Sequence, residues 1–122
     1  MAGDASSPQP PPAKSAALRN FERMLAMGKD SALLRYSIGN EYVKAADYPS
    51  AIEALSQAVA QDATYTAAWK LYAHALEHAG RHADALDAYR RGIVVARQKG
   101  DRQAEKEMTV FARRIERANP SA

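Results

Sequence analysis

The central part of this sequence repeats itself with a period of 34 residues. Apolar and small residues of a first copy largely recur as apolar and small residues in a second. The first copy contains Leu34, Ile38, Gly39, Tyr42, Ala51, Leu55, Ala58 and Val59, and the second contains Ala68, Tyr72, Ala73, Leu76, Ala85, Tyr89, Gly92 and Ile93. A fixed period of this size is typical of stacked helical hairpins. The repeat therefore predicts an all-α fold. It also favours a function in binding, through a groove, over a function in catalysis.

Composition narrows the possible functions. The chain has 122 residues, enough for one compact domain, and no cysteine, which excludes a disulfide scaffold, thiolate catalysis and cysteine-ligated metal. It shows no Gly-rich phosphate loop and no nucleophile-elbow motif. We therefore expect no enzyme activity and no cofactor. With no apolar run long enough for a signal peptide or membrane span, the expected location is the cytoplasm.

Apolar stripes at helical spacing, glycine stops and capping residues predict about six helices. Residues 1–14, which are rich in proline, are expected to form a disordered tail, and residues 120–122 a second short tail. Residues 15–119 are expected to form a single helical domain. Its predicted helices cover residues 15–27, 31–46, 47–61, 64–79, 82–99 and 101–118.

The repeated residues resemble those of the tetratricopeptide repeat (TPR) family. Residues 32–65 match its pattern through Ile38, Gly39, Tyr42, Ala51, Leu55 and Ala58, and residues 66–99 through Trp69, Tyr72, Ala73, Leu76, Ala85, Tyr89 and Gly92. Arg35 departs from the usual tryptophan, and Ala63 from the usual proline between repeats. The resemblance implies a TPR-like superhelix of antiparallel helix pairs, with residues 15–27 and 101–118 as capping helices.

The resemblance also implies a concave groove lined by the first helix of each pair. At the family's groove positions this sequence has Tyr36, Asn40, Lys44, Lys70, His74 and Glu77. If Ala104 and Met108 of the last helix face the core, Arg102 and Arg113 join this groove. The implied function is a non-catalytic protein-interaction module that binds a peptide segment or a partner helix. A groove that reads a C-terminal carboxylate is one version, although Tyr36 and His74 stand where the family's clamp has lysine and asparagine.

Three other readings remain open. The stack could associate with itself as a scaffold, although a monomer is expected. Basic residues outnumber acidic ones between Arg97 and Arg117 in a chain of net charge +3, which could favour nucleic acid, but the interspersed acids argue against it. The four-residue spacing of His74, His78 and His82 invites a metal, but Gly80 is expected to break the helix before His82.

Overall fold

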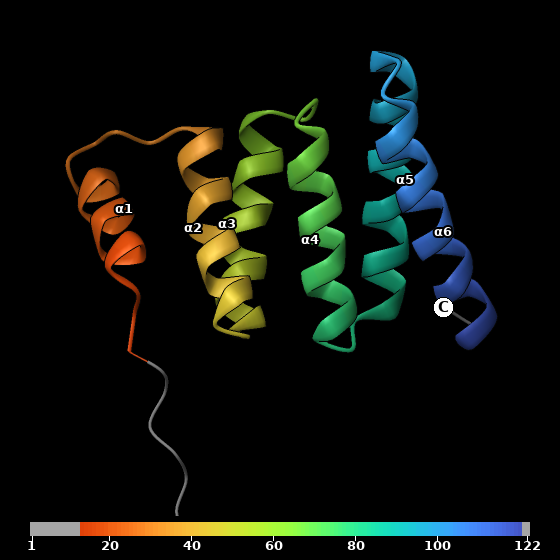
Figure 1. Ribbon diagram of the computed structural model, residues 1–122, viewed down its shortest axis with the longest axis horizontal. Helices are drawn as coiled ribbons and strands as arrows, with labels where there is room; N and C mark the ends of the chain where they lie inside the picture. Colours follow the sequence, from red (N-terminus) through yellow and green to blue (C-terminus); the bar gives the residue numbers. More distant parts are fainter. Residues whose placement is uncertain (1–12, 121–122) are drawn as a thin grey trace, which may run out of the picture.

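The structure is a computed structural model that describes residues 13–120, and within them all regular secondary structure is helical (Figure 1). The all-α prediction is confirmed. The helices are α1 (Ala16–Ala26), α2 (Ala32–Lys44), α3 (Tyr48–Gln61), α4 (Thr66–His78), α5 (His82–Lys99) and α6 (Arg102–Ala118). The predicted tails lie almost wholly outside the described residues.

The helices stack as two hairpins between two single helices. α2 pairs with α3 and α4 pairs with α5, while α1 packs on α2 at one end and α6 packs on α5 at the other (Figure 1). α4 also contacts both α2 and α6, so these three helices form one layer. α3 and α5 lie behind that layer (Figure 1). One side of the molecule is thus built from α2, α4 and α6.

Short polar side chains and glycines set the helix ends. The Ser31 hydroxyl accepts a hydrogen bond from the Leu34 amide at the start of α2, and the Asp47 carboxylate accepts one from the Ser50 amide at the start of α3. Gly80 and Gly100 take left-handed backbone angles, with φ of 80° and 72°, where the helices before them end. These signals explain why the predicted boundaries lie close to the observed ones.

The turn between α2 and α3 repeats the turn between α4 and α5 in backbone form. Ala46, which lies 34 residues before Gly80, has a φ of 57° and is the one non-glycine residue with positive φ among the described residues. An L-residue in this conformation costs about 1–2 kcal/mol. The backbone conformation thus repeats after 34 residues at this turn, although the residue changes from Ala46 to Gly80.

The largest fully buried side chains run through the stack from one hairpin to the last helix. They are Leu55, Leu76, Tyr89, Met108 and Ile115, and they come from α3, α4, α5 and α6. Many of the remaining core positions are alanine, which lets the helices approach closely. The buried residues form three clusters, and partly buried side chains such as Tyr36 and Tyr42 each pack against two of them, so the repeats and the terminal helices are joined along the stack.

Two glycines inside helices are sites of close approach. A Cβ atom on Gly39 of α2 would lie 2.5 Å from Cγ of Leu55 in α3, and one on Gly92 of α5 would lie 2.6 Å from Sδ of Met108 in α6. Both Leu55 and Met108 are fully buried, but Leu55 branches at the contacted atom. Met108 meets the glycine with the far end of a flexible chain, which can move more easily.

We expect Gly39→Ala to lower the thermal midpoint more than Gly92→Ala does. Overpacking costs about 1–3 kcal/mol and should exceed the roughly 1 kcal/mol that alanine gains over glycine in a helix. At Gly92 the two effects should nearly cancel, although the Trp69 Cβ at 3.0 Å leaves little room. Thermal unfolding followed by circular dichroism gives both midpoints. Equal midpoints for the two variants would contradict this explanation.

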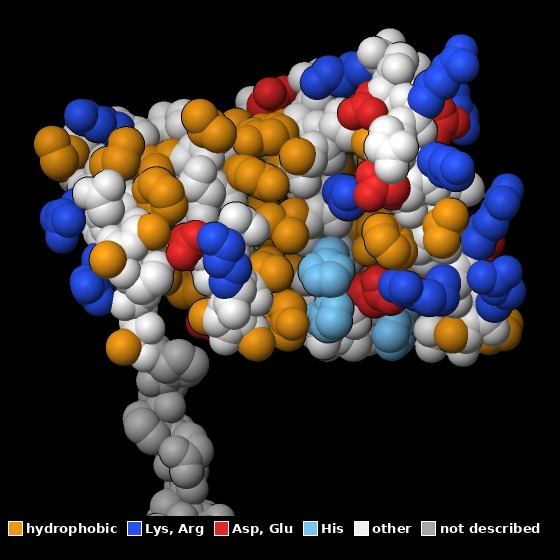
Figure 2. All heavy atoms as spheres, viewed as in Figure 1, with side chains coloured by type: hydrophobic (Ala, Val, Ile, Leu, Met, Phe, Trp, Pro, Cys, Tyr) orange, Lys and Arg blue, Asp and Glu red, His pale blue; other side chains and the backbone are white. Residues whose placement is uncertain are grey.

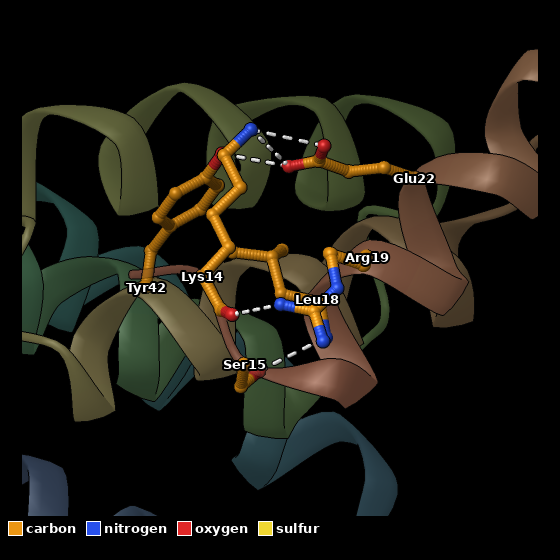
Figure 3. Close-up of polar contacts among 6 residues, drawn as sticks. All are labelled: Lys14, Ser15, Leu18, Arg19, Glu22 and Tyr42. Atoms are coloured by element: carbon orange, nitrogen blue, oxygen red, sulfur yellow. Dashed lines mark hydrogen bonds and ion pairs between the residues drawn. The ribbon is translucent and has the colours of Figure 1, made fainter. Parts of the chain in front are cut away.

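A small polar network attaches α1 to the first repeat (Figure 3). The Glu22 carboxylate accepts hydrogen bonds from the Lys14 ammonium at 2.9 Å and from the Tyr42 hydroxyl at 3.0 Å. The bond from Lys14 lowers the pKa of Glu22, whereas burial raises the pKa of Tyr42. Below this network, Leu18 is buried against α2. α1 therefore covers the apolar end of the stack, as a capping helix should.

Candidate peptide-binding groove

A hollow of about 350 Å³ lies on the side of the molecule built from α2, α4 and α6. Its lining is mostly apolar and aromatic, with two basic side chains, and consists of Tyr36, Ala67, Lys70, Leu71, His74, Tyr89 and Phe111. Figure 2 shows this side of the molecule, where hydrophobic side chains run over α1, α2 and α4 and cationic ones gather over α6. Because it draws on α2, α4 and α6, the hollow needs both repeats and the terminal helix. We call it the groove hollow.

An ion pair spans α4 and α6 beside the groove hollow. The Lys70 ammonium lies 3.0 Å from a Glu107 carboxylate oxygen, and both side chains are a little more than one third exposed. A pair at this exposure contributes little to stability. Because the charge of Lys70 is already paired with Glu107, Lys70 is not a free cation for a ligand's carboxylate.

The Glu77 carboxylate holds two contacts beside the groove hollow. Glu77 of α4 accepts a hydrogen bond from the hydroxyl of buried Tyr89 at 3.2 Å and one from the Arg114 guanidinium at 2.9 Å. Burial, together with the nearby Glu77 charge, raises the pKa of Tyr89 far above its usual range. The Arg114 guanidinium also lies 5.1 Å from the Phe111 ring centroid. These contacts hold Tyr89 and Phe111, two of the lining rings, in place.

Histidines occupy the lower part of the same side. The His74 and His78 rings lie 4.3 Å apart, and His78 stacks on Tyr48 at 5.1 Å. His82 begins the next helix, and its buried Nδ1 has no hydrogen-bond partner among the described residues. No group of three or more His, Cys, Asp or Glu residues suited to a metal occurs in the described part of the chain. In the structure the His74 and His78 rings form a tilted aromatic pair, with an angle of 56° between their planes.

We expect the stability of the protein to fall below about pH 6.5 in a way that depends on His74. Burial, aided by the neighbouring His78, lowers the pKa of His74 in the folded chain. Between that lowered pKa and the ordinary value of about 6.5, the unfolded chain binds more protons, so lowering the pH favours unfolding. His74→Gln should therefore lose less stability than the parent between pH 7.5 and pH 5.5. Parallel urea titrations test this, and an unchanged pH dependence would contradict it.

The predicted groove residues do not all come together. Tyr36, Lys70 and His74 line the groove hollow. Asn40 is half-buried outside this lining, and Glu77 is engaged by Tyr89 and Arg114 as described above. Lys44 pairs with Glu41 at 3.0 Å and borders a separate hollow of about 640 Å³ between α1 and the end of α2.

The register expected for the last helix is wrong. α6 turns Glu107, Phe111 and Arg114 toward α4, and these residues lie three or four apart on one helical face. Arg102 and Arg113 are exposed and lie on another face. Met108 is buried and Ala104 packs against the core, as expected, but this does not bring Arg102 and Arg113 into the groove, because a terminal helix without a following partner need not keep the repeat's register. Leu71 and Phe111 also line the groove hollow, although neither is among the predicted groove residues. Phe111 belongs to the apolar stripe of the last helix, which predicts a core residue, and Leu71 corresponds to Ser37 in the first copy, so the repeat gives no signal for it.

Comparison with known proteins agrees with this architecture. Residues 36–101 match the model of the tetratricopeptide repeat family. The chain is 46% identical over 101 residues to the TPR repeat-containing protein PA0015 of Pseudomonas aeruginosa, covering 83% of this chain and 96% of that protein.

Two solved structures have similar folds. The solution structure of protein BPP2914 from Bordetella parapertussis superposes with a TM-score of 0.75 at 36% identity, covering 86% of this chain and 91% of that one. The crystal structure of MamA superposes with a TM-score of 0.61 at 19% identity, covering 86% and 70%, and shows likeness of fold alone. The chain belongs to the tetratricopeptide repeat family, whose domains generally mediate protein interactions.

Proposed function

We propose that the protein binds a peptide segment or a helix of a partner protein on the side formed by α2, α4 and α6. In this proposal a large apolar side chain of the partner enters the groove hollow. The observation that carries it is the lining of that hollow, where Tyr36, Leu71 and Phe111 come from three different helices. Such an apolar recess with a few polar groups at its edge is the usual form of a binding site.

The size and surroundings of the groove hollow favour an anchoring side chain. About 350 Å³ is near the lower end of the range for ligand pockets, so we expect it to hold one or two side chains of a longer segment. Leu33 on the same helix as Tyr36 is 65% exposed. It offers further apolar surface one helical turn before Tyr36, and we expect it to contact the rest of the bound segment.

The ion pairs argue against recognition of a C-terminal carboxylate. Lys70 is paired with Glu107 and Arg114 with Glu77, so the cations nearest the groove hollow are already neutralised. An incoming carboxylate would replace one carboxylate partner of these cations by another, so the exchange would add little free energy of binding. We therefore expect amidation of a bound peptide's C-terminus to change its affinity little.

Selection from a random peptide library displayed on phage tests the proposal. The enriched peptides should share a large apolar residue, and replacing that residue by serine should reduce binding more than any other single change, by about thirtyfold or more. Free and amidated versions of one selected peptide provide the comparison for the carboxylate. A selected peptide that loses its affinity on amidation but tolerates serine at its apolar residue would contradict the apolar-anchor proposal.

A further inference from the structure

The charged side chains of α6 are sorted between its two sides. Three acidic residues face the body of the protein, where each pairs with a cation of α4 or α5. These pairs are Glu105 with Arg97 at 2.9 Å, Glu107 with Lys70 at 3.0 Å, and Glu116 with Arg90 at 3.7 Å. The fourth acid of this segment, Asp101, accepts a hydrogen bond from the Ala104 amide and caps the helix. The acids of this segment are thus engaged within the protein.

The cations on the outer side of α6 have no such partners. Arg102, Lys106, Arg113 and Arg117 are exposed, and none makes an ion pair or a side-chain hydrogen bond within residues 13–120. Their spacing of four, seven and four residues places them on one helical face. Val110, 54% exposed, lies between them on this face. Figure 2 shows cationic side chains gathered over α6. We call this surface the basic face.

We propose that the basic face binds an acidic helical segment of a partner protein, with carboxylates opposite the four cations and an apolar residue opposite Val110. From Arg102 to Arg117 the face extends about 22 Å along the axis. That length matches four turns of a partner helix carrying acidic residues at similar spacing. Guanidinium groups bind carboxylates through paired hydrogen bonds, which gives such a contact direction as well as charge.

The surroundings of the basic face favour this occupant over nucleic acid. No aromatic residue lies on the face to stack against a base, and the exposed Val110 offers a phosphate backbone nothing to bind. An acidic amphipathic helix supplies both negative charge and apolar surface. Because these cations are exposed, they can also attract a negatively charged partner at a distance and raise the rate of association.

A second copy of this chain is a poor occupant when stacked end to end. The opposite end of the stack is formed by α1, whose exposed residues include Arg19 and Arg23. Stacking α6 of one copy on α1 of another would bring cations against cations, which is destabilising. The same repulsion acts against the scaffold alternative, in which copies associate through their ends.

The basic face and the groove hollow lie on different faces of α6. Phe111 and Glu107 face α4, whereas Lys106 and Arg113 face away from the body of the protein. Binding at one surface therefore leaves the other accessible. The proposal does not depend on the function proposed for the groove, and changes on the outer face of α6 test it separately.

Fluorescence anisotropy of the whole protein with a labelled probe tests this inference. The probe is a capped 16-residue helical peptide with glutamates at four-residue spacing and one central leucine, and its matched control has glutamine at every glutamate. We expect the acidic probe to bind at least tenfold more tightly than the glutamine control at 50 mM salt, and its affinity to fall as salt rises. Lys106→Glu with Arg113→Glu should weaken binding of the acidic probe about tenfold or more.

The control variant carries Arg19→Glu with Arg23→Glu, which changes the net charge equally at the other end of the stack. It should bind the acidic probe within about twofold of the parent. Val110→Ser should weaken the binding of the acidic probe severalfold and leave the binding of a single-stranded oligonucleotide unchanged. An equal loss in both charge-reversed variants would contradict a local site, as would tighter binding of the oligonucleotide than of the peptide.

Discussion

Replacing Trp69 with alanine is expected to destabilise the protein by about 3–5 kcal/mol, the usual cost of removing a large aromatic side chain from a core. Trp69 is 7% exposed, and its indole Nε1 donates a hydrogen bond of 2.8 Å to the Ala63 carbonyl between the repeats. Its Cβ lies beside Gly92 of α5, and the Arg91 guanidinium lies 5.9 Å from its ring centroid. The substitution therefore removes contacts between the two repeats and within the second.

Urea unfolding followed by circular dichroism at 222 nm measures this loss without relying on fluorescence, since Trp69 is the only tryptophan. Trp69→Phe is the matched control, because it keeps a ring in the core but removes the bond to Ala63. It should cost less than half as much as alanine. If Trp69→Ala changed the free energy of unfolding by less than about 1 kcal/mol, the ring could not be a core element.

Replacing Ala67 with tryptophan is expected to abolish binding at the groove while leaving the fold intact. Ala67 is exposed on α4 and lines the groove hollow, so a large ring there would occupy the space proposed for the partner's apolar side chain. Loss of a buried anchor contact is worth about 2 kcal/mol or more, so the affinity should fall at least thirtyfold. Isothermal titration calorimetry with a library-selected peptide measures the change.

Ala83→Trp provides the control for this experiment. Ala83 is also an exposed helical alanine, but it lies on α5 and does not line the groove hollow. The variant should bind the selected peptide with unchanged affinity, and both variants should melt within a few degrees of the parent. Equal loss of binding in the two variants would point to a general effect of the added ring and would contradict the groove assignment.

Much of the fold could be predicted from the sequence because its signals are local. The cap at Ser31, the proline in the first turn of α3 and the stop at Gly80 each act within a few residues. The period then placed the two hairpins in equivalent positions. Ala46 shows the limit, because its left-handed conformation follows from its position in the repeated turn and not from its residue type.

The groove could be predicted only in part. Tyr36, Lys70 and His74 lie on the first helices of the two repeats. The 34-residue pattern predicts which faces of these helices are buried, and all three residues line the groove hollow. Arg102 and Arg113 lie on the terminal helix, whose rotation depends on how Met108 and Ile115 pack against α5. The ion pairs that neutralise the groove cations join α4 to α6 across 37 positions of sequence, and no local pattern indicates them.

Amide chemical-shift mapping of the isotope-labelled protein with a library-selected peptide tests the central claim most directly. We expect the largest shifts at Tyr36, Ala67, Lys70, Leu71, His74 and Phe111, the residues around the groove hollow. We also expect amidation of the peptide's C-terminus to leave the pattern unchanged. Shifts confined to the hollow beside Lys44, or to the outer side of α6, would contradict binding in the groove.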